Sequence, residues 1–246
     1  MIDINNKRFN FYDPIKSIEQ EEKKEKIFSD IIFILSEKYI PDREENKIRN
    51  QFGNLLLNYN NQNLENSIPQ KVFSGFENII SEKIILKLEK NIKEVSLLSS
   101  NFILIDINNY KNFKNIEKIL YEIINRRGIP IISHPERFIV FEKENIEKLK
   151  EKGVLFQLSL GSFSSFFGEN ASVKSRDYLE SGIYDFIASD YTTYNQENDD
   201  FLENQISDIS KIIGSNKLNE LTYNNPKNVI DEKSKNDFLL LNTKRS

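Results

Sequence analysis

Short apolar runs recur along this chain, and the segments between them are charged or carry apolar residues at helical spacing. A short apolar run that ends abruptly in polar residues is typical of a buried strand. The strands predicted in this way are residues 1–4, 31–35, 71–76, 102–107, 130–133, 155–160 and 185–189.

Helices are predicted in three of the intervening segments, which are residues 115–128, 144–153 and 172–182. In the first of them, apolar residues such as Ile116 and Leu120 fall on one helical stripe. Each segment ends at a glycine, and glycine is the usual residue where a helix terminates in a left-handed turn. We therefore expect these three glycines to cap their helices.

A further helix is predicted after the second strand. Asp42 and Glu45 form a capping box there, ahead of a helical face that includes Ile48 and Phe52. The asparagine-rich residues 58–70 that follow are predicted to be a loop.

Strands that alternate with helices indicate an α/β protein with a parallel sheet. The regular repetition of these βα units favours a closed or nearly closed (β/α)7 barrel, and a doubly wound open sheet is the alternative. No segment has the composition of a linker, so residues 1–246 are predicted to form a single domain.

Composition and charge exclude several classes of function. The net charge is −4 and no block of Lys and Arg with interleaved aromatics occurs, which argues against nucleic-acid binding. The chain has no Cys, which excludes disulfides, thiolate zinc sites and a cysteine nucleophile. No apolar run approaches the roughly 20 residues of a membrane span, and residues 1–11 have no apolar signal core, so we expect no membrane insertion and a cytoplasmic location.

Candidate chemistry is concentrated where the predicted strands end. Asp106, His134 and Asp190 directly follow apolar runs, and Glu77 lies close to the end of another. In an α/β barrel the carboxyl ends of the strands meet at one mouth, where carboxylates and an imidazole could hold a divalent cation. Asp after a strand is also an ordinary turn or helix-cap residue, so position alone leaves a purely structural interpretation open.

The residues 129–138, IPIISHPERF, resemble the PIIAHPER segment of the PHP (polymerase and histidinol phosphatase) superfamily. The similarity is to the branch of bacterial metal-dependent tyrosine phosphatases linked to capsule and exopolysaccharide synthesis. Weaker similarities occur in the same order along nearly the whole chain. SGFENI resembles PGQEIR, FILID resembles ILIEF, LGSFSSFFG resembles AGSLxGxFG, and DFIASDYT resembles HFIASDAH.

This resemblance implies a PHP-type distorted TIM-like barrel of seven parallel strands with a cluster of metal ions, often manganese, at its mouth. It implies that Glu77, Asp106, His134 and Asp190 are metal ligands, with Asp106 in place of a Glu. It also implies that His134 and Arg137 are catalytic, with Arg137 holding the phosphoryl oxygens.

The chain departs from the family pattern at its histidines. The family's opening IDIHCH segment has two metal-binding histidines, whose positions here are Asn5 and Lys7. A third histidine, after the second strand, is lost from the segment that contains Glu37, and the last one corresponds to Thr192. Because His134 is the only histidine in the chain, no other alignment restores a multi-histidine cluster. We therefore expect weak metal binding and a degenerate phosphatase.

Two functions follow from this partial resemblance. The first is a residual manganese-dependent or other divalent-metal-dependent phosphatase that acts on phosphotyrosine, with a bacterial tyrosine kinase as a candidate partner. The second, which the missing histidines favour, is a pseudophosphatase that binds phosphate or a phosphotyrosine peptide without cleaving it. In that case Arg137, Lys7 and the backbone of residues 161–168 would hold the phosphate. A structural partner of a polysaccharide-synthesis complex is a third interpretation.

The glycine-flanked serines of residues 161–168 are not expected to be nucleophiles, because the only histidine would have to be their base. This segment is instead predicted to be a flexible rim loop. Phe163, Phe166 and Phe167 are predicted to anchor it by packing underneath.

Overall fold

The computed structural model describes residues 2–6, 30–36, 47–48, 50–52, 54, 71–108, 110, 112–190 and 199–231. Within them, parallel strands form one seven-stranded sheet in which each strand pairs with its neighbours in the sequence. The strands are β1 (Ile2–Asn6), β2 (Asp30–Ser36), β3 (Lys71–Ile79), β4 (Phe102–Asp106), β5 (Ile129–Ser133), β6 (Leu155–Ser159) and β7 (Phe186–Ala188). Each strand predicted from an apolar run is present, with small shifts at its ends.

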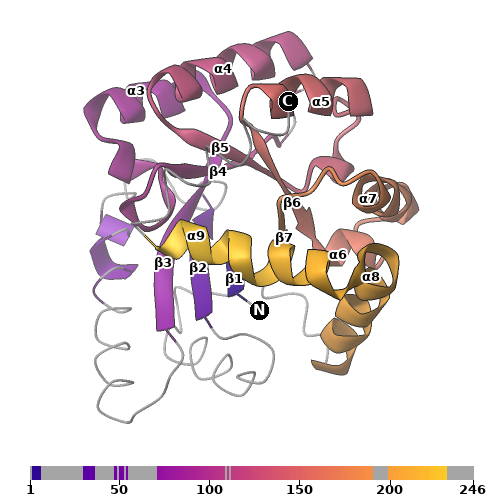
Figure 1. Ribbon diagram of the computed structural model, residues 1–246. Coiled ribbons are helices and arrows are strands. Elements are labelled where there is room, and N and C mark those ends of the chain that lie inside the picture. Colours follow the sequence, from indigo (N-terminus) through magenta and orange to yellow (C-terminus); the bar gives the residue numbers. More distant parts are fainter. Residues whose placement is uncertain are drawn as a thin grey trace.

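Helices connect successive strands from β3 onward, and Figure 1 shows α3, α4 and α5 along one side of the sheet. The connecting helices are α3 (Glu82–Lys90), α4 (Phe113–Asn125), α5 (Lys143–Glu151), α6 (Leu160–Phe163) and α7 (Glu169–Glu180), and α8 (Asp199–Asn219) and α9 (Asn225–Ile230) follow β7. The three helices predicted between strands correspond to α4, α5 and α7. The capping box of Asp42 and Glu45 and the predicted loop at residues 58–70 lie outside the described residues.

The C-terminal segment crosses from β7 toward β1 (Figure 1). Helix α8 bends at Gly214, whose φ is 78°, and a π-helical turn at Glu220–Asn224 connects it to α9. This turn contacts both β7 and β1. None of the helices in the described part of the chain has the length and apolar character needed to cross a bilayer.

Both faces of the sheet are buried from β4 to β7, where alternate residues of a strand pack into different apolar clusters. In β4, Ile103 and Ile105 pack with the helices, whereas Phe102 and Leu104 belong to a cluster formed mainly by strand residues. This second cluster defines what we call the inner face, and it contains Ile34, Leu97, Phe102, Leu104, Ile129, Ile131, Leu155, Phe186, Ala188 and Val229. Burial on both faces explains why the strands are continuous apolar runs in the sequence.

The order of the strands distinguishes the two predicted α/β architectures. In a doubly wound sheet the strand order reverses at a switch point, whereas here it runs from β1 to β7 without reversal. The doubly wound alternative is therefore wrong, and the parallel α/β class is confirmed. The edge strands β1 and β7 contact each other, as they do in a barrel. Hydrogen-bonded closure between them is not seen among the residues described and stays a prediction.

The C-terminal turn of α4 differs from the prediction in the residue that adopts the left-handed conformation. Gly153 and Gly182 have positive φ after α5 and α7, as expected, but after α4 it is Arg127 that does so, with φ 66°. Arg127 N donates to Ile124 O and Gly128 N donates to Ile123 O, which is the Schellman arrangement. Gly128 is needed for a different reason, since a Cβ there would lie 2.7 Å from Ile123 Cγ2.

Opposite effects on stability are expected for two substitutions in this turn. Gly128→Ala should destabilise the protein by about 1–3 kcal/mol, because the added methyl group overpacks against Ile123. Arg127→Gly should cause no loss and up to about 1 kcal/mol of gain, because glycine adopts positive φ without steric cost. Urea denaturation of the two variants measures both effects. A larger loss for Arg127→Gly than for Gly128→Ala would contradict this assignment.

Candidate metal and phosphate site

Polar side chains replace apolar ones on the inner face where the strands reach their carboxyl ends. In β4 the inner residues Phe102 and Leu104 are followed by Asp106, and in β5 Ile131 is followed by Ser133. Parallel strands all end at the same edge, so side chains from distant parts of the sequence meet there. The buried polar residues at or near this edge include Ser36, Glu77, Asp106, Ser133, His134, Gln157, Ser159 and Asp190.

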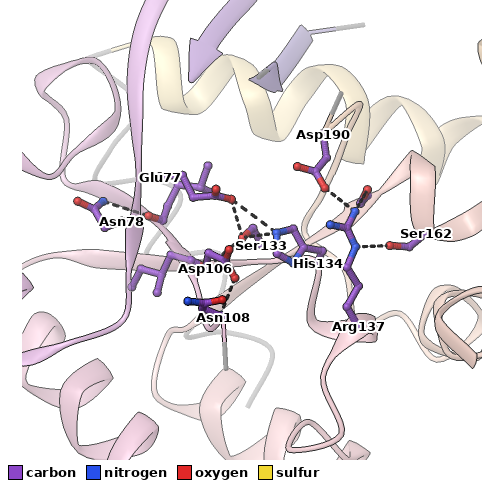
Figure 2. A network of polar contacts seen from close by, with 12 residues as sticks. Glu77, Asn78, Asp106, Asn108, Ser133, His134, Arg137, Ser162 and Asp190 are labelled. Carbon is purple, nitrogen blue, oxygen red and sulfur yellow. Dashed lines mark hydrogen bonds and ion pairs between the residues drawn. The ribbon is translucent and has the colours of Figure 1, made fainter. Parts of the chain in front are cut away.

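Three of the four predicted metal-binding residues come together at this edge (Figure 2). Glu77 lies on β3, His134 directly follows β5, and Asp190 lies just after β7. Each offers one ligand atom, the three atoms lie within 4.8 Å of one another, and all three residues are buried. We refer to these residues as the acid–imidazole group.

Asp106, the fourth predicted ligand, lies at the same edge but outside this group. Its Oδ1 accepts a hydrogen bond from Asn108 N at 2.7 Å, so the carboxylate caps the turn after β4. This is the ordinary turn role of an aspartate. Its side chain is one methylene shorter than the Glu of the family pattern, which is consistent with a local contact in place of one across the mouth.

His134 reaches the group from an unusual backbone conformation. Its φ of 40° and ψ of 54° are left-handed, and Asp190 also has a positive φ, of 50°. Such conformations cost about 1–3 kcal/mol in residues other than glycine and occur preferentially at functional sites. His134 Nε2 lies 3.6 Å from Glu77 Oε1. Nδ1 is buried and has no hydrogen-bond partner among the described residues.

Ser133 connects Glu77 to His134, and the motif analysis did not identify it. Its Oγ lies 3.0 Å from Glu77 Oε1, 3.1 Å from Ile105 O and 3.2 Å from His134 Nε2. The hydroxyl therefore restrains both members of the acid–imidazole group. A period of two from Ile129 and Ile131 places Ser133 on the inner face, so this alternation was a signal that could have found it.

The guanidinium of Arg137 lies beside Asp190 on the other side of the group (Figure 2). Its Nε donates to Ser162 Oγ at 2.8 Å, and its Nη2 donates to Ser159 Oγ and to Asp190 Oδ2. Arg137 is thus held by three acceptors from different segments. Its side chain keeps 17% of its surface exposed, so Arg137 is fixed without being completely buried.

The segment after β6 begins as a short helix, where a rim loop was predicted. Residues 160–163 form α6 and are buried, and Ser162 within it is the acceptor for Arg137. The prediction that three phenylalanines pack underneath holds for Phe163 alone. Phe166 is 49% exposed and Phe167 is 38% exposed. The ring of Phe167 lies over the guanidinium of Arg137, with its centroid 3.4 Å from Cζ.

Glu136, between His134 and Arg137 in sequence, points away from the acid–imidazole group. Its Oε2 accepts from Tyr184 OH at 3.0 Å, and its Oε1 accepts from Ser159 N at 3.4 Å. Burial, together with the nearby Glu136 carboxylate, holds the pKa of the Tyr184 phenol well above its usual range, so the phenol remains a donor. These bonds tie the turn that carries His134 and Arg137 to β6 and to the start of β7.

The acid–imidazole group fits one divalent cation. Two carboxylates and an imidazole are suitable donors for manganese or magnesium, and the buried Nδ1 of His134 is open to a partner. The carboxylate of Asp190 is already paired with Arg137, so an ion bound there would share it. Within the described residues this is the one group of three such side chains.

A sheet of sequentially ordered parallel strands with acidic and imidazole groups at its carboxyl edge is the architecture of α/β proteins that carry a metal-dependent site at the strand ends. Residues 15–231 match the family model described as capsular polysaccharide synthesis, CpsB/CapC. The chain belongs to this family. The predicted relationship to the capsule-associated phosphatase branch is therefore confirmed.

Individual relatives support the same relationship. The tyrosine-protein phosphatase YwqE of Bacillus subtilis (strain 168) is 30% identical over 137 residues, which are 53% of this chain and 52% of YwqE. The tyrosine-protein phosphatase CpsB of Streptococcus pneumoniae is 28% identical over 152 residues, which are 58% of this chain and 61% of CpsB. These matches thus span less than two thirds of either relative.

A crystal structure from the study of YwqE and CpsB, which are called unique metal-dependent tyrosine phosphatases, confirms the fold. It superimposes with a TM-score of 0.73 at 22% identity and covers 94% of each chain.

Metal titration should separate the acid–imidazole group from Asp106. We expect at most one manganese ion per chain, and Glu77→Gln should weaken its binding by roughly 10- to 100-fold. Asp106→Asn is the matched control, because an amide oxygen can still cap the turn at Asn108, and it should change the affinity only a few-fold. Elemental analysis and calorimetric titration measure these quantities. Two or three tightly bound ions, or equal losses in both variants, would contradict the geometry.

Proposed function

We propose that this chain binds phosphate monoesters at the carboxyl edge of its sheet, with phosphotyrosine on a protein as the ligand, and that it hydrolyses them weakly. The observation that carries the proposal is the placement of Arg137. The guanidinium of Arg137 is held by Ser159, Ser162 and Asp190 next to the acid–imidazole group, and its side chain is not completely buried. Guanidinium groups bind phosphoryl oxygens through charge-assisted hydrogen bonds.

The chain's own residues have distinct tasks in this proposal. Arg137 binds the phosphoryl group and Asp190 orients Arg137. Ser133 fixes Glu77 and His134 relative to each other. A divalent cation, when bound to the acid–imidazole group, supplies Lewis acidity toward the phosphoryl oxygens.

Weak hydrolysis follows from the loss of histidines. The chain has one histidine, and the positions that match the other metal-binding histidines of the family pattern are Asn5, Lys7, Glu37 and Thr192. Of these, Asn5 lies in β1, and the other three lie outside the described residues. A site with fewer ligands holds its metal less tightly and in a less defined geometry.

Binding without turnover is the second candidate function, and the pairing of Arg137 with Asp190 favours it. This ion pair neutralises a carboxylate that a metal ion would otherwise use. A pseudophosphatase of this kind would recognise a phosphotyrosine peptide, for example in a bacterial tyrosine kinase, and keep it intact. The names of the relatives, which are tyrosine phosphatases, support this class of ligand. Manganese-dependent turnover of a generic aryl phosphate separates the two functions.

Restoring the missing histidines tests whether the weak activity comes only from the missing metal ligands. The variant that combines Asn5→His, Lys7→His, Glu37→His and Thr192→His should bind manganese more tightly and hydrolyse p-nitrophenyl phosphate about 10²-fold faster or more. Lys7→His contributes in two ways, because it also removes a cation from the expected mouth. The measurement is initial rate against manganese concentration. A folded variant that binds manganese without a gain in rate would show that the defect lies elsewhere.

A second measurement tests Arg137 in the same four-histidine background. Arg137→Ala should reduce the recovered turnover by roughly 10²-fold, as expected for a group that stabilises charge in the transition state. Arg137→Lys, which can still pair with Asp190 but lacks the planar fork, should lose less. Thermal melting of each variant controls for folding. Unchanged turnover in Arg137→Ala would refute the assigned role.

A further inference from the structure

We propose that Phe166 and Phe167 form an aromatic platform at the mouth of the site and select aryl over alkyl phosphate monoesters. This inference rests on the proposed function, because it takes Arg137 as the group that binds the phosphoryl oxygens. It adds the residues that recognise the part of the ligand beyond the phosphorus. We refer to these two residues as the phenylalanine platform.

The contacts of Arg137 determine where an anion approaches. Its Nε and Nη2 are engaged by Ser162, Ser159 and Asp190, and one face of the guanidinium is covered by the ring of Phe167. Nη1 has no hydrogen-bond partner among the described residues. A phosphoryl group that binds at the Nη1 edge therefore lies close to the Phe167 ring, and its ester substituent extends beside the platform.

The two rings present apolar surface at this position. Phe166 and Phe167 meet edge to face, with centroids 5.0 Å apart and an interplanar angle of 80°. Both remain well exposed, whereas Phe163 of the same segment is buried. Exposed aromatic surface next to a guanidinium suits a ligand that combines an anionic group with an aromatic ring.

The backbone holds the platform in place. Phe166 N donates to Gly161 O at 3.1 Å, and Gly168 N donates to Ser165 O at 2.9 Å, so the turn that carries both rings is closed by hydrogen bonds. A Cβ at Gly161 would lie 2.8 Å from Phe167 Cε2, which means that the ring rests directly on the backbone of α6. Phe167 is therefore held in position by packing against the backbone of α6.

The platform distinguishes ligands by a ring contact. In an aryl phosphate, such as the side chain of phosphotyrosine, the ring is attached through the ester oxygen and can pack against Phe166 and Phe167 while the phosphoryl group reaches Arg137. An alkyl phosphate, such as that of phosphoserine, places its phosphoryl group at Arg137 but has no ring to pack against the platform. One additional aromatic pair in the complex corresponds to an affinity for aryl phosphates that is roughly three- to tenfold higher than for alkyl phosphates.

Two phosphonates that the protein cannot hydrolyse test the proposal. Phenylphosphonate should bind the wild-type protein roughly three- to tenfold more tightly than methylphosphonate, as measured by NMR titration. Phe166→Ala removes an exposed ring that is not stacked on Arg137. It should reduce the preference for phenylphosphonate to less than about twofold and leave the affinity for methylphosphonate unchanged. Leu86→Ala removes another exposed apolar side chain, from α3, and is the control, with no expected effect.

The outcomes separate this proposal from the one on which it rests. Equal affinities for the two phosphonates would overturn the platform and leave phosphate binding by Arg137 intact. Binding of neither phosphonate would overturn both. A full phenyl preference in both Phe166→Ala and Phe167→Leu would also overturn the platform, because the selectivity would then come from other residues.

Discussion

Two buried carboxylates close to each other are stabilised by a nearby positive charge, and Arg137 supplies one at this site. Glu77 and Asp190 each place an oxygen within 4.8 Å of the other ligand atoms of their group. Like charges at this separation in a buried site strongly disfavour each other's ionised form unless a cation is near. The guanidinium of Arg137, paired with Asp190 and braced by Ser159 and Ser162, places such a cation beside the group.

The surrounding turn is organised around that ion pair. His134 adopts a left-handed conformation directly before Pro135. The turn that follows brings Arg137 back over the ends of β6 and β7. Glu136 stabilises the same turn by accepting a hydrogen bond from the hydroxyl of Tyr184. One short motif thus places an imidazole, a guanidinium and a structural carboxylate in three different directions.

The sequence predicted the strands and most of the site for a simple physical reason. Burial on both faces makes each strand a continuous apolar run, and the first polar residues after such a run lie at the common edge. This is why Glu77, His134 and Asp190 could be placed together. Asp106 could not be distinguished from them, because the choice between a turn contact and a contact across the mouth depends on side-chain reach.

Other features depended on three-dimensional packing that no local pattern contains. The left-handed residue after α4 is Arg127, whereas Gly128 is needed because a Cβ there would meet side chains of α4 and β4. Likewise, the sequence of residues 160–168 gives no sign that Phe163 is buried while Phe167 covers a guanidinium. Alternation of residues along a strand predicts the direction of side chains well, whereas irregular turns require knowledge of what packs against them.

The sequential order of the strands links the site to the completeness of the fold. Each strand pairs only with its neighbours in the sequence, so the pairings from β1 to β6 do not involve the last strand. The acid–imidazole group draws on β3, β5 and β7, and Arg137 finds its carboxylate only once β7 is in place. A ligand that contacts all of these residues binds only the fully folded sheet. By mass action, its binding therefore stabilises the fully folded state.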